Sequence, residues 1–306
     1  MTKVLVTGCA GFIGSPLVDK LLESDYGVTG VDCFTDYYHR EIKEANISNA
    51  LKNNNFEFME EDILNIEKFP EVDYVFHLAA QAGVRTSWGK NFEIYTKNNI
   101  EATQKLLEFY KDRVIKKFVY ASSSSVYGNA ELPMREDSLL KPVSPYGVTK
   151  LAGENLCYLY WKNYNVPTVS LRYFTVYGPG QRPDMAIHKF VRAILNDKEI
   201  TVYGDGTQTR DFTYVDDAVE ANILAANNNL VGEVFNIGGS RISVNELINE
   251  IEKIVGNKAK IKSIEKQKGD VRDTLADVNK AKKELGWMPM INIYKGLEKY
   301  IKWYKR

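Results

Sequence analysis

The sequence predicts an α/β fold built on a doubly wound parallel sheet. Its first half alternates short β-branched runs with longer stretches of helical apolar spacing, which is typical of parallel strands with helices on both faces. A glycine-rich turn directly follows the first apolar run, at the position where such folds bind phosphate groups. The chain has 306 residues, enough for this sheet and a smaller second domain.

Each expected strand is a short apolar run bounded by turn residues. The first, Val4-Leu5-Val6, is continuous, as in a strand that is buried on both faces. The expected strands are Lys3–Val6, Gly27–Val31, Phe56–Glu60, Tyr74–His77, Lys117–Tyr120 and Thr168–Leu171. Beyond residue 173 the pattern loosens, and helices are expected near Val215–Asn227, Val244–Val255 and Tyr294–Tyr304. We therefore expect a first domain at residues 1–174 and a second at 175–306, parts of which return to the first.

Composition narrows the class of protein. Lysine plus arginine and aspartate plus glutamate each total 40, so the chain lacks the basic character of a general nucleic-acid binder. No apolar run approaches the ~20 residues that cross a bilayer, and the N-terminal segment lacks a signal-peptide pattern. The three cysteines lie far apart, which favours neither disulfides nor a metal site. We expect a cytoplasmic protein with no metal and no nucleic-acid or membrane partner.

The glycine-rich turn has GxxGxxG spacing at Gly8, Gly11 and Gly14. Glycines let the backbone approach a pyrophosphate closely, and the following helix N-terminus offers partial positive charge. Asp32 ends the next strand, where a carboxylate binds the ribose 2′-hydroxyl and repels a 2′-phosphate. This pattern predicts NAD rather than NADP, although the spacing alone also suits a structural turn without a ligand.

Tyr146 and Lys150 lie four residues apart in a stretch of helix formers, which places both side chains on one helical face. A neighbouring ammonium favours the phenolate and predicts a lowered pKa for the tyrosine. The serine cluster Ser122–Ser125 follows a strand and offers a hydroxyl to the same reacting oxygen. The alternative is an ordinary tyrosine–lysine pair on a surface helix.

Metal and hydrolase sites are not favoured. His39, His77 and His188 have no ligand spacing, and His77 ends an apolar strand, which predicts a packed histidine. The serine cluster lacks a Gly-x-Ser-x-Gly elbow.

These motifs resemble those of the extended short-chain dehydrogenase/reductase family, specifically its nucleotide-sugar epimerases. The match runs essentially end to end and is carried by Thr7–Gly14, Asp62-Ile63, His77–Ala80, Ser122–Gly128, Tyr146–Lys150, Arg172–Pro179, Thr209–Phe212 and Gly269–Val271. The resemblance implies a Rossmann-type NAD-binding domain, a C-terminal UDP-sugar-binding domain and a homodimer. It implies NAD contacts at Gly8, Gly11, Phe12, Ile13, Gly14, Asp32, Asp62, Ile63, Leu78, Ala79, Ala80, Asn98, Tyr146, Lys150 and Tyr173.

The resemblance also implies the reaction, a reversible inversion at C4 of a UDP-hexose through a 4-keto form. Tyr146 would act as the base, Ser123 would bind the same oxygen, and Lys150 would hold the nicotinamide ribose. Dehydratases of the family have an acid pair, and decarboxylases a glutamate, where this chain has Ser124-Ser125. An epimerase therefore remains.

The segments Asp32–Tyr38, Gln81–Arg85 and Arg172–Ala186 resemble the UDP-glucuronate 4-epimerases, whereas UDP-glucose 4-epimerases carry asparagine at the position of Thr175. Serine and threonine hydroxyls, with a nearby arginine, suit a C6 carboxylate. The implied UDP-sugar contacts are Arg85, Ser123, Ser124, Ser125, Tyr146, Thr175, Arg182, Met185, Lys189, Thr201, Tyr203, Gln208, Arg210, Asp270 and Arg272. Alternatively, Arg182 only closes its loop over the diphosphate.

We expect interconversion of UDP-glucuronate and UDP-galacturonate. The nearest alternative is a UDP-glucose/UDP-galactose 4-epimerase, and a distant one is a non-catalytic NAD-binding protein of the same fold. One departure from the family is Asn91-Phe92, where the family usually has Asn-Pro; it affects the loop and no expected catalytic position.

Overall fold

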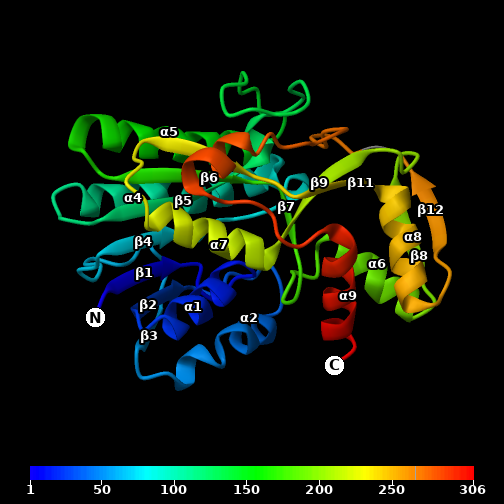
Figure 1. Ribbon diagram of the computed structural model, residues 1–306, viewed down its shortest axis with the longest axis horizontal. Coiled ribbons are helices and arrows are strands. Elements are labelled where there is room, and N and C mark those ends of the chain that lie inside the picture. Colours follow the sequence, from blue (N-terminus) through cyan, green and yellow to red (C-terminus); the bar gives the residue numbers. More distant parts are fainter. Residues whose placement is uncertain (266) are drawn as a thin grey trace.

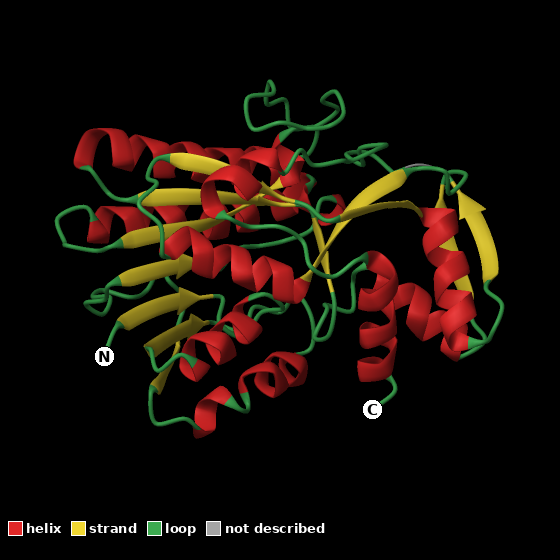
Figure 2. Ribbon diagram, viewed as in Figure 1, coloured by secondary structure: helices red, strands yellow, loops and turns green. Residues whose placement is uncertain are grey.

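The computed structural model describes residues 1–265 and 267–306, and helices flank both faces of one large sheet (Figures 1 and 2). Seven strands pair in parallel in the order β10-β6-β5-β4-β1-β2-β3. They are β1 (Lys3–Thr7), β2 (Gly27–Asp32), β3 (Phe56–Glu60), β4 (Tyr74–His77), β5 (Lys117–Ser123), β6 (Thr168–Tyr173) and β10 (Glu233–Ile237). This sheet confirms the predicted doubly wound α/β class.

The helices form two layers because the strands bury apolar side chains on both faces. In β1, Val4 and Val6 pack into one core cluster with α1, whereas Leu5 packs into another with α4 and α5, and all three are fully buried. The helices of this part are α1 (Gly14–Glu23), α2 (Arg40–Ile47), α3 (Phe92–Thr96), α4 (Ala102–Tyr110), α5 (Pro145–Tyr164) and α7 (Val215–Ala226). A π-helical turn at Lys97–Glu101 joins α3 to α4.

The second half of the chain builds a smaller unit beside the carboxyl ends of the strands (Figure 1). A three-stranded sheet has the order β11-β9-β7, and β12 pairs with β8. These elements are β7 (Thr175–Tyr177), β8 (Glu199–Tyr203), β9 (Thr209–Tyr214), β11 (Ser240–Ser243), β12 (Lys260–Ile264), α6 (Ala186–Leu195), α8 (Val244–Val255) and α9 (Ile293–Tyr304). Strand β10 lies between these segments in sequence but pairs with β6 in the large sheet.

Several predicted elements are confirmed residue for residue. Strands β3 and β4 and helix α8 have the expected bounds, while β5 continues to Ser123 where the prediction ended at Tyr120. Strands β7 to β12 were not predicted. Strand β7 has only three residues and β12 is exposed along its whole length, whereas β9 and β10 end in buried runs that the sequence analysis did not recognise as strands. Among residues 1–265 and 267–306, no helix is both long and apolar enough to span a bilayer.

Candidate active site

The glycine turn lies at the carboxyl end of β1, where β1 separates β2 from β4 and the sheet order reverses. Gly8 has φ +71°, and a Cβ built there would be 2.7 Å from the Ala79 nitrogen. A Cβ on Gly14 would be 2.0 Å from the Gly8 oxygen. Both positions therefore require glycine, and the turn brings its backbone against the segment that follows β4.

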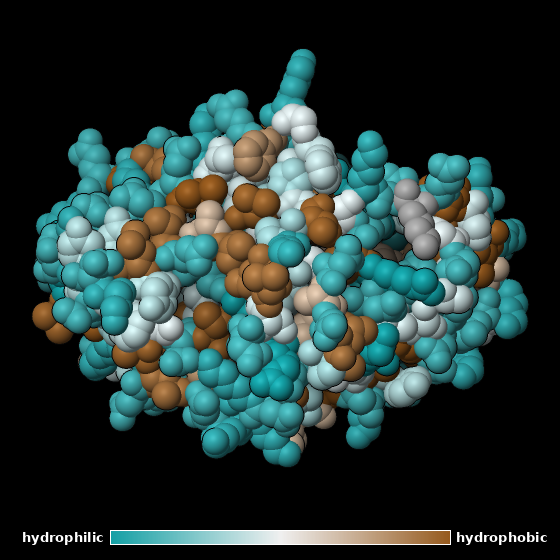
Figure 3. Space-filling model, turned by 90° about the horizontal axis from the view of Figure 1, so that it is seen from above, coloured by the Kyte–Doolittle hydropathy of each residue, from teal (hydrophilic) through white to brown (hydrophobic). Residues whose placement is uncertain are grey.

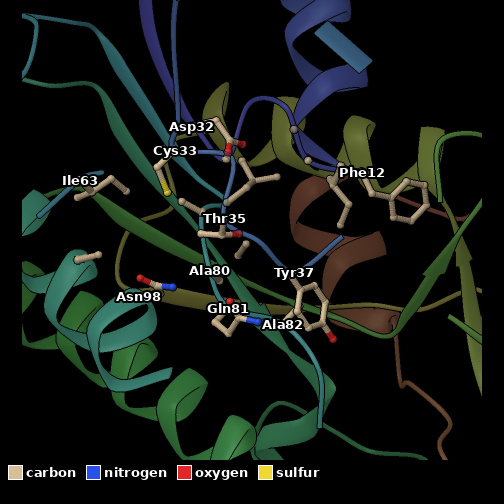
Figure 4. A pocket seen from close by; sticks show the side chains of 18 of the residues that line it. Phe12, Asp32, Cys33, Thr35, Tyr37, Ile63, Ala80, Gln81, Ala82 and Asn98 are labelled. Carbon is tan, nitrogen blue, oxygen red and sulfur yellow. The ribbon is translucent and has the colours of Figure 1, made fainter. Parts of the chain in front are cut away.

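One cleft opens over this turn, and every residue expected to contact NAD lines it (Figure 4). The lining runs from Asp62 and Ile63, past the glycine turn and Asp32, to Tyr146 and Lys150. The cleft lies outside the carboxyl ends of the strands, at the place where open α/β sheets bind ligands.

Asp32 is held by two backbone N–H groups. Its Oδ1 accepts a hydrogen bond from Phe34 N at 2.9 Å, and its Oδ2 accepts one from Ala10 N at 3.1 Å. Burial raises the pKa of this carboxyl, while the two N–H groups and the nearby Lys43 oppose the rise. The carboxylate is thus fixed beside the glycine turn, where it suits a pair of ribose hydroxyls.

Tyr146 lies in the first turn of α5. Ser144 caps this helix, since its side-chain oxygen accepts a hydrogen bond from Gly147 N at 3.1 Å, and Pro145 occupies the first helical position. Burial raises the pKa of Tyr146, and a hydrogen bond with Ser123 and the charge of Arg182 oppose that rise. The phenol therefore lies next to the Ser123 hydroxyl, at the carboxyl end of β5.

Lys150 is buried one turn further along α5, and its Nζ donates a hydrogen bond to the Ala121 carbonyl at 2.7 Å. Burial lowers the pKa of this amine to about 7. We expected the lysine ammonium to lower the pKa of Tyr146. That expectation is wrong for this structure: burial raises the pKa of Tyr146, and the groups that oppose the rise are Ser123 and Arg182 rather than Lys150.

A buried ion pair holds α5, the helix that carries Tyr146 and Lys150, to the sheet. The side chains of Arg172 on β6 and Glu154 on α5 are only 3% and 6% exposed. The Glu154 carboxylate accepts hydrogen bonds from Arg172 Nε at 3.0 Å and from Ser122 Oγ at 2.7 Å. Ser122 itself lines the cleft, so this pair fixes β5 against α5 next to Ser123 and Tyr146.

A second cleft lies in the smaller unit, between α6, β8 and β9. The predicted substrate residues that line it are Arg85, Thr175, Lys189, Thr201, Tyr203, Gln208, Arg210, Asp270 and Arg272. Gln208 Oε1 is buried and has no hydrogen-bond partner among the described residues, so it remains available to a donor on a ligand. Arg85 crosses from the large unit, donating to Asp270 Oδ2 at 2.7 Å and stacking 3.9 Å above the Tyr203 ring.

Arg182 and Asp184 join the two clefts. Arg182 lines the first cleft and Asp184 the second. Arg182 donates from Nε to Asp184 Oδ1 at 2.9 Å and from Nη2 to Asp184 Oδ2 at 3.1 Å. Arg182, which the sequence offers as a cation for a C6 carboxylate, is thus already paired with Asp184 on one edge of its guanidinium.

Four predicted substrate residues line neither cleft: Ser123, Ser124, Ser125 and Met185. Ser123 still reaches Tyr146, and Ser124 and Ser125 begin the short turn after β5. Met185 precedes α6 and packs against the main core.

The sequence did not single out several residues that line the first cleft, among them Thr35, Lys43 and Gln81. The resemblance offered a signal for Thr35 and Gln81, which lie in the segments Asp32–Tyr38 and Gln81–Arg85, but none for Lys43. The predicted packed histidine is confirmed: His77 is buried, with Nδ1 2.7 Å from Thr7 Oγ1 and Nε2 2.9 Å from Thr103 Oγ1. No group of three or more metal-ligating side chains occurs in residues 1–265 and 267–306.

Known proteins match the chain over nearly its whole length. The "NAD dependent epimerase/dehydratase family" matches residues 4–238. A Bacillus cereus UDP-glucuronic acid 4-epimerase, solved in complex with UDP-glucuronic acid and NAD, is 47% identical with a TM-score of 0.97, covering 99% of each chain. A UDP-glucuronate 4-epimerase from Thermodesulfobacterium geofontis is 42% identical over 100% of this chain and 97% of the relative. An uncharacterized UDP-glucose epimerase, YtcB of Bacillus subtilis, is 44% identical over 96% of this chain and 95% of the relative.

Proposed function

The chain belongs to the NAD-dependent epimerase/dehydratase family, and on this premise we propose that it interconverts UDP-glucuronate and UDP-galacturonate by inverting C4. The observation that carries the proposal is the single cleft that joins the glycine turn and Asp32 to Tyr146 and Lys150. UDP-glucuronate 4-epimerases that are 42% and 47% identical to the chain over its whole length support this substrate.

The first cleft fits NAD. The glycine turn and the N-terminus of α1 together present backbone N–H groups that would bind the pyrophosphate. Asp32 offers a fixed carboxylate to the adenine ribose. When bound, NAD would supply the chemistry of hydride transfer: it would accept the hydride from C4 of the sugar and return it to the opposite face of the same carbon. The residues expected to contact NAD, all of which line this cleft, would hold it.

Tyr146 removes the proton from the sugar 4-hydroxyl and returns it after inversion. Ser123 shares that oxygen through its hydrogen bond with the phenol. Lys150 is anchored on the Ala121 carbonyl, which directs its amine into the cleft beside Tyr146, where it would hold the nicotinamide ribose. The cationic Arg182 stabilises the phenolate and so opposes the effect of burial on the pKa of Tyr146.

The second cleft suits the UDP half of the substrate. Lys189, Arg210 and Arg272 bring positive charge for the diphosphate. Thr201 and Tyr203 would approach the uracil, and the unpartnered Gln208 oxygen accepts a donor from the nucleoside. Asp270 would reach the ribose from its ion pair with Arg85.

The C6 carboxylate would lie between the two clefts. Arg182 uses Nε and Nη2 on Asp184, so its Nη1 edge stays available to the sugar, and Thr175 adds a hydroxyl from the second cleft. Holding the carboxylate has a chemical purpose, because the 4-keto form of a uronic acid is a β-keto acid that can lose carbon dioxide. A fixed carboxylate keeps the breaking bond out of the geometry for that loss.

The competing substrate is UDP-glucose, because one relative of comparable identity carries that name. The deciding experiment incubates the purified protein with UDP-glucuronate and, separately, with UDP-glucose, and resolves the products by NMR. We expect UDP-galacturonate from the first and little product from the second. Faster conversion of UDP-glucose would overturn the proposed substrate, UDP-glucuronate. If neither sugar nucleotide is converted, the proposed epimerase activity is overturned.

We also propose that the enzyme is a cytoplasmic homodimer that pairs through α4 and α5. Val148, Tyr158 and Leu159 on α5 are about half exposed, at 47%, 53% and 48%. Figure 3, which looks down on the α5 side of Figure 1, shows apolar patches among hydrophilic side chains. Such patches mark protein interfaces, and light scattering after gel filtration would give twice the chain mass of 34.9 kDa.

A further inference from the structure

The segment after β2 crosses the first cleft. It leaves the sheet at Asp32, and its Tyr37 ring lies beside Gln81 and Ala82, which follow β4 (Figure 4). The Tyr37 hydroxyl donates a hydrogen bond to Asp184 Oδ2 at 3.2 Å. One side chain therefore connects three loops, which follow β2, β4 and β7.

The loop after β4 is shaped to receive this phenol. Gly83 has φ +105°, and a Cβ built there would be 2.4 Å from the Tyr37 hydroxyl and 2.8 Å from Thr86 Oγ1. Both hydroxyls thus lie against the same side of this glycine, where a side chain has no room, and Thr86 lowers the pKa of the Tyr37 phenol as a hydrogen-bond partner does. Thr86 Oγ1 is in turn 2.7 Å from the hydroxyl of the buried Tyr95, which donates to the Ala82 and Gly83 carbonyls. The far anchor of Tyr37 is therefore well fixed.

The near anchor is fixed as well. Asp184 accepts two hydrogen bonds from Arg182, whose guanidinium lies 5.6 Å from the Tyr37 ring centre. Burial alone would raise the pKa of Asp184, but Arg182 and Tyr37 hold it below its usual value, so it remains a charged acceptor. Tyr37 and Arg182 both line the first cleft.

We propose that Tyr37, Asp184 and Thr86 form a clasp over the first cleft that retains bound NAD between catalytic cycles. This inference rests on the proposed function, in which the same NAD takes and returns the hydride and has no need to leave. A dinucleotide beneath Tyr37 leaves only after the phenol separates from Asp184 and Thr86. The clasp acts on the rate of NAD release, and the chemistry at Tyr146 does not depend on it.

Tyr37→Phe tests the clasp, because it removes the hydroxyl and keeps the ring under Arg182. Tyr38→Phe is the matched control: Tyr38 is the adjacent residue and lines the same cleft, but its hydroxyl makes no hydrogen bond among the described residues. Each holoenzyme is loaded with NAD and separated from free NAD. Excess fluorescent etheno-NAD is then added as a competitor, so that released NAD does not rebind. At each time point the protein is removed by filtration, and the NAD in the filtrate is measured by HPLC.

We expect Tyr37→Phe to release NAD about three- to tenfold faster than the parent enzyme, as for the loss of one or two hydrogen bonds. Tyr38→Phe should release it at the parent rate. Thr86→Val removes the other hydroxyl from outside the cleft and should speed release similarly, and it serves as the test if Tyr37→Phe does not fold. Equal release from the parent and Tyr37→Phe overturns the clasp, as does equal acceleration by both phenylalanine variants.

Turnover of UDP-glucuronate in the same preparations separates the two proposals. Faster release from Tyr37→Phe in a protein that never epimerises UDP-sugars supports the clasp and refutes the proposed function. Unchanged release in a working epimerase refutes the clasp alone.

Discussion

Replacing Arg182 by glutamine tests how the enzyme selects its substrate. The change removes the cation that our proposal places beside the C6 carboxylate, and it leaves Asp184 without the two hydrogen bonds that it accepts from Arg182. UDP-glucuronate then meets an uncompensated negative charge, whereas the neutral C6 hydroxymethyl of UDP-glucose does not. The variant should therefore lose activity on the acid far more than on the neutral sugar.

The size of the effect follows from the contacts that are lost. A hydrogen bond to a charged group contributes about 1.5–3 kcal/mol, which corresponds to about a 10- to 150-fold change in kcat/KM. The Arg182 side chain is 21% exposed, so solvent screens the interaction only in part. We expect the ratio of kcat/KM for UDP-glucuronate to that for UDP-glucose to fall by about 10- to 100-fold.

Initial rates with both substrates, followed by separation of the epimers, measure this ratio. The double variant Arg182→Gln/Asp184→Asn is the control, because it also removes the charge left behind on Asp184. Equal losses on both substrates would refute the assignment and support a role for Arg182 in closing its loop over the diphosphate. If the double variant fully recovers the ratio, the effect comes from the unpaired carboxylate of Asp184 and not from the lost contact between Arg182 and the substrate.

Three further predictions concern the catalytic helix. Tyr146→Phe removes the base and should lower kcat about 10²- to 10⁴-fold while NAD stays bound after gel filtration; a rate near that of the parent enzyme argues against the phenol as base. Arg172→Leu leaves the Glu154 charge buried and should lower the free energy of unfolding in urea by about 3–5 kcal/mol, most of which the Arg172→Leu/Glu154→Leu double variant should regain; a loss no larger than that of a surface change contradicts this. Burial lowers the pKa of Lys150 to about 7, so between pH 7 and the usual lysine pKa of 10.5 the unfolded chain holds a proton that the folded, NAD-free chain has released. Stability should therefore rise with pH across this window and rise less in Lys150→Met, and equal slopes in urea unfolding would contradict the shift.

Much of the fold was predictable because local patterns specify local structure. Tyr74–His77 became a strand with the expected bounds, since a parallel strand buried on both faces needs a continuous apolar stretch. Phe56–Glu60 also has the expected bounds, although none of its residues is buried. Most strands of the smaller unit were missed because they are short or exposed: β7 has three residues, and β12 has no buried residue in its range. Such strands are defined by their pairing partners rather than by their own composition.

The candidate site divides in the same way. Gly8 and Gly14 are required by backbone approaches within one turn, and Tyr146 and Lys150 share a face through helical geometry, so the sequence alone located the cleft that holds both motifs. The effect on the pKa of Tyr146 was not predictable, because it depends on Arg182 and on burial.

The linear order of residues determined the turn, the capped helix and the reactive pair, since each arises from neighbours a few positions apart. Only the folded molecule decided which charges meet: Arg85 pairs with Asp270 across 185 positions, and Tyr37 bonds to Asp184 across 147. Ion pairing, desolvation and the clasp depend on such distant partners, and no local pattern encodes them because chain closure over such lengths is governed by the packing of the whole core.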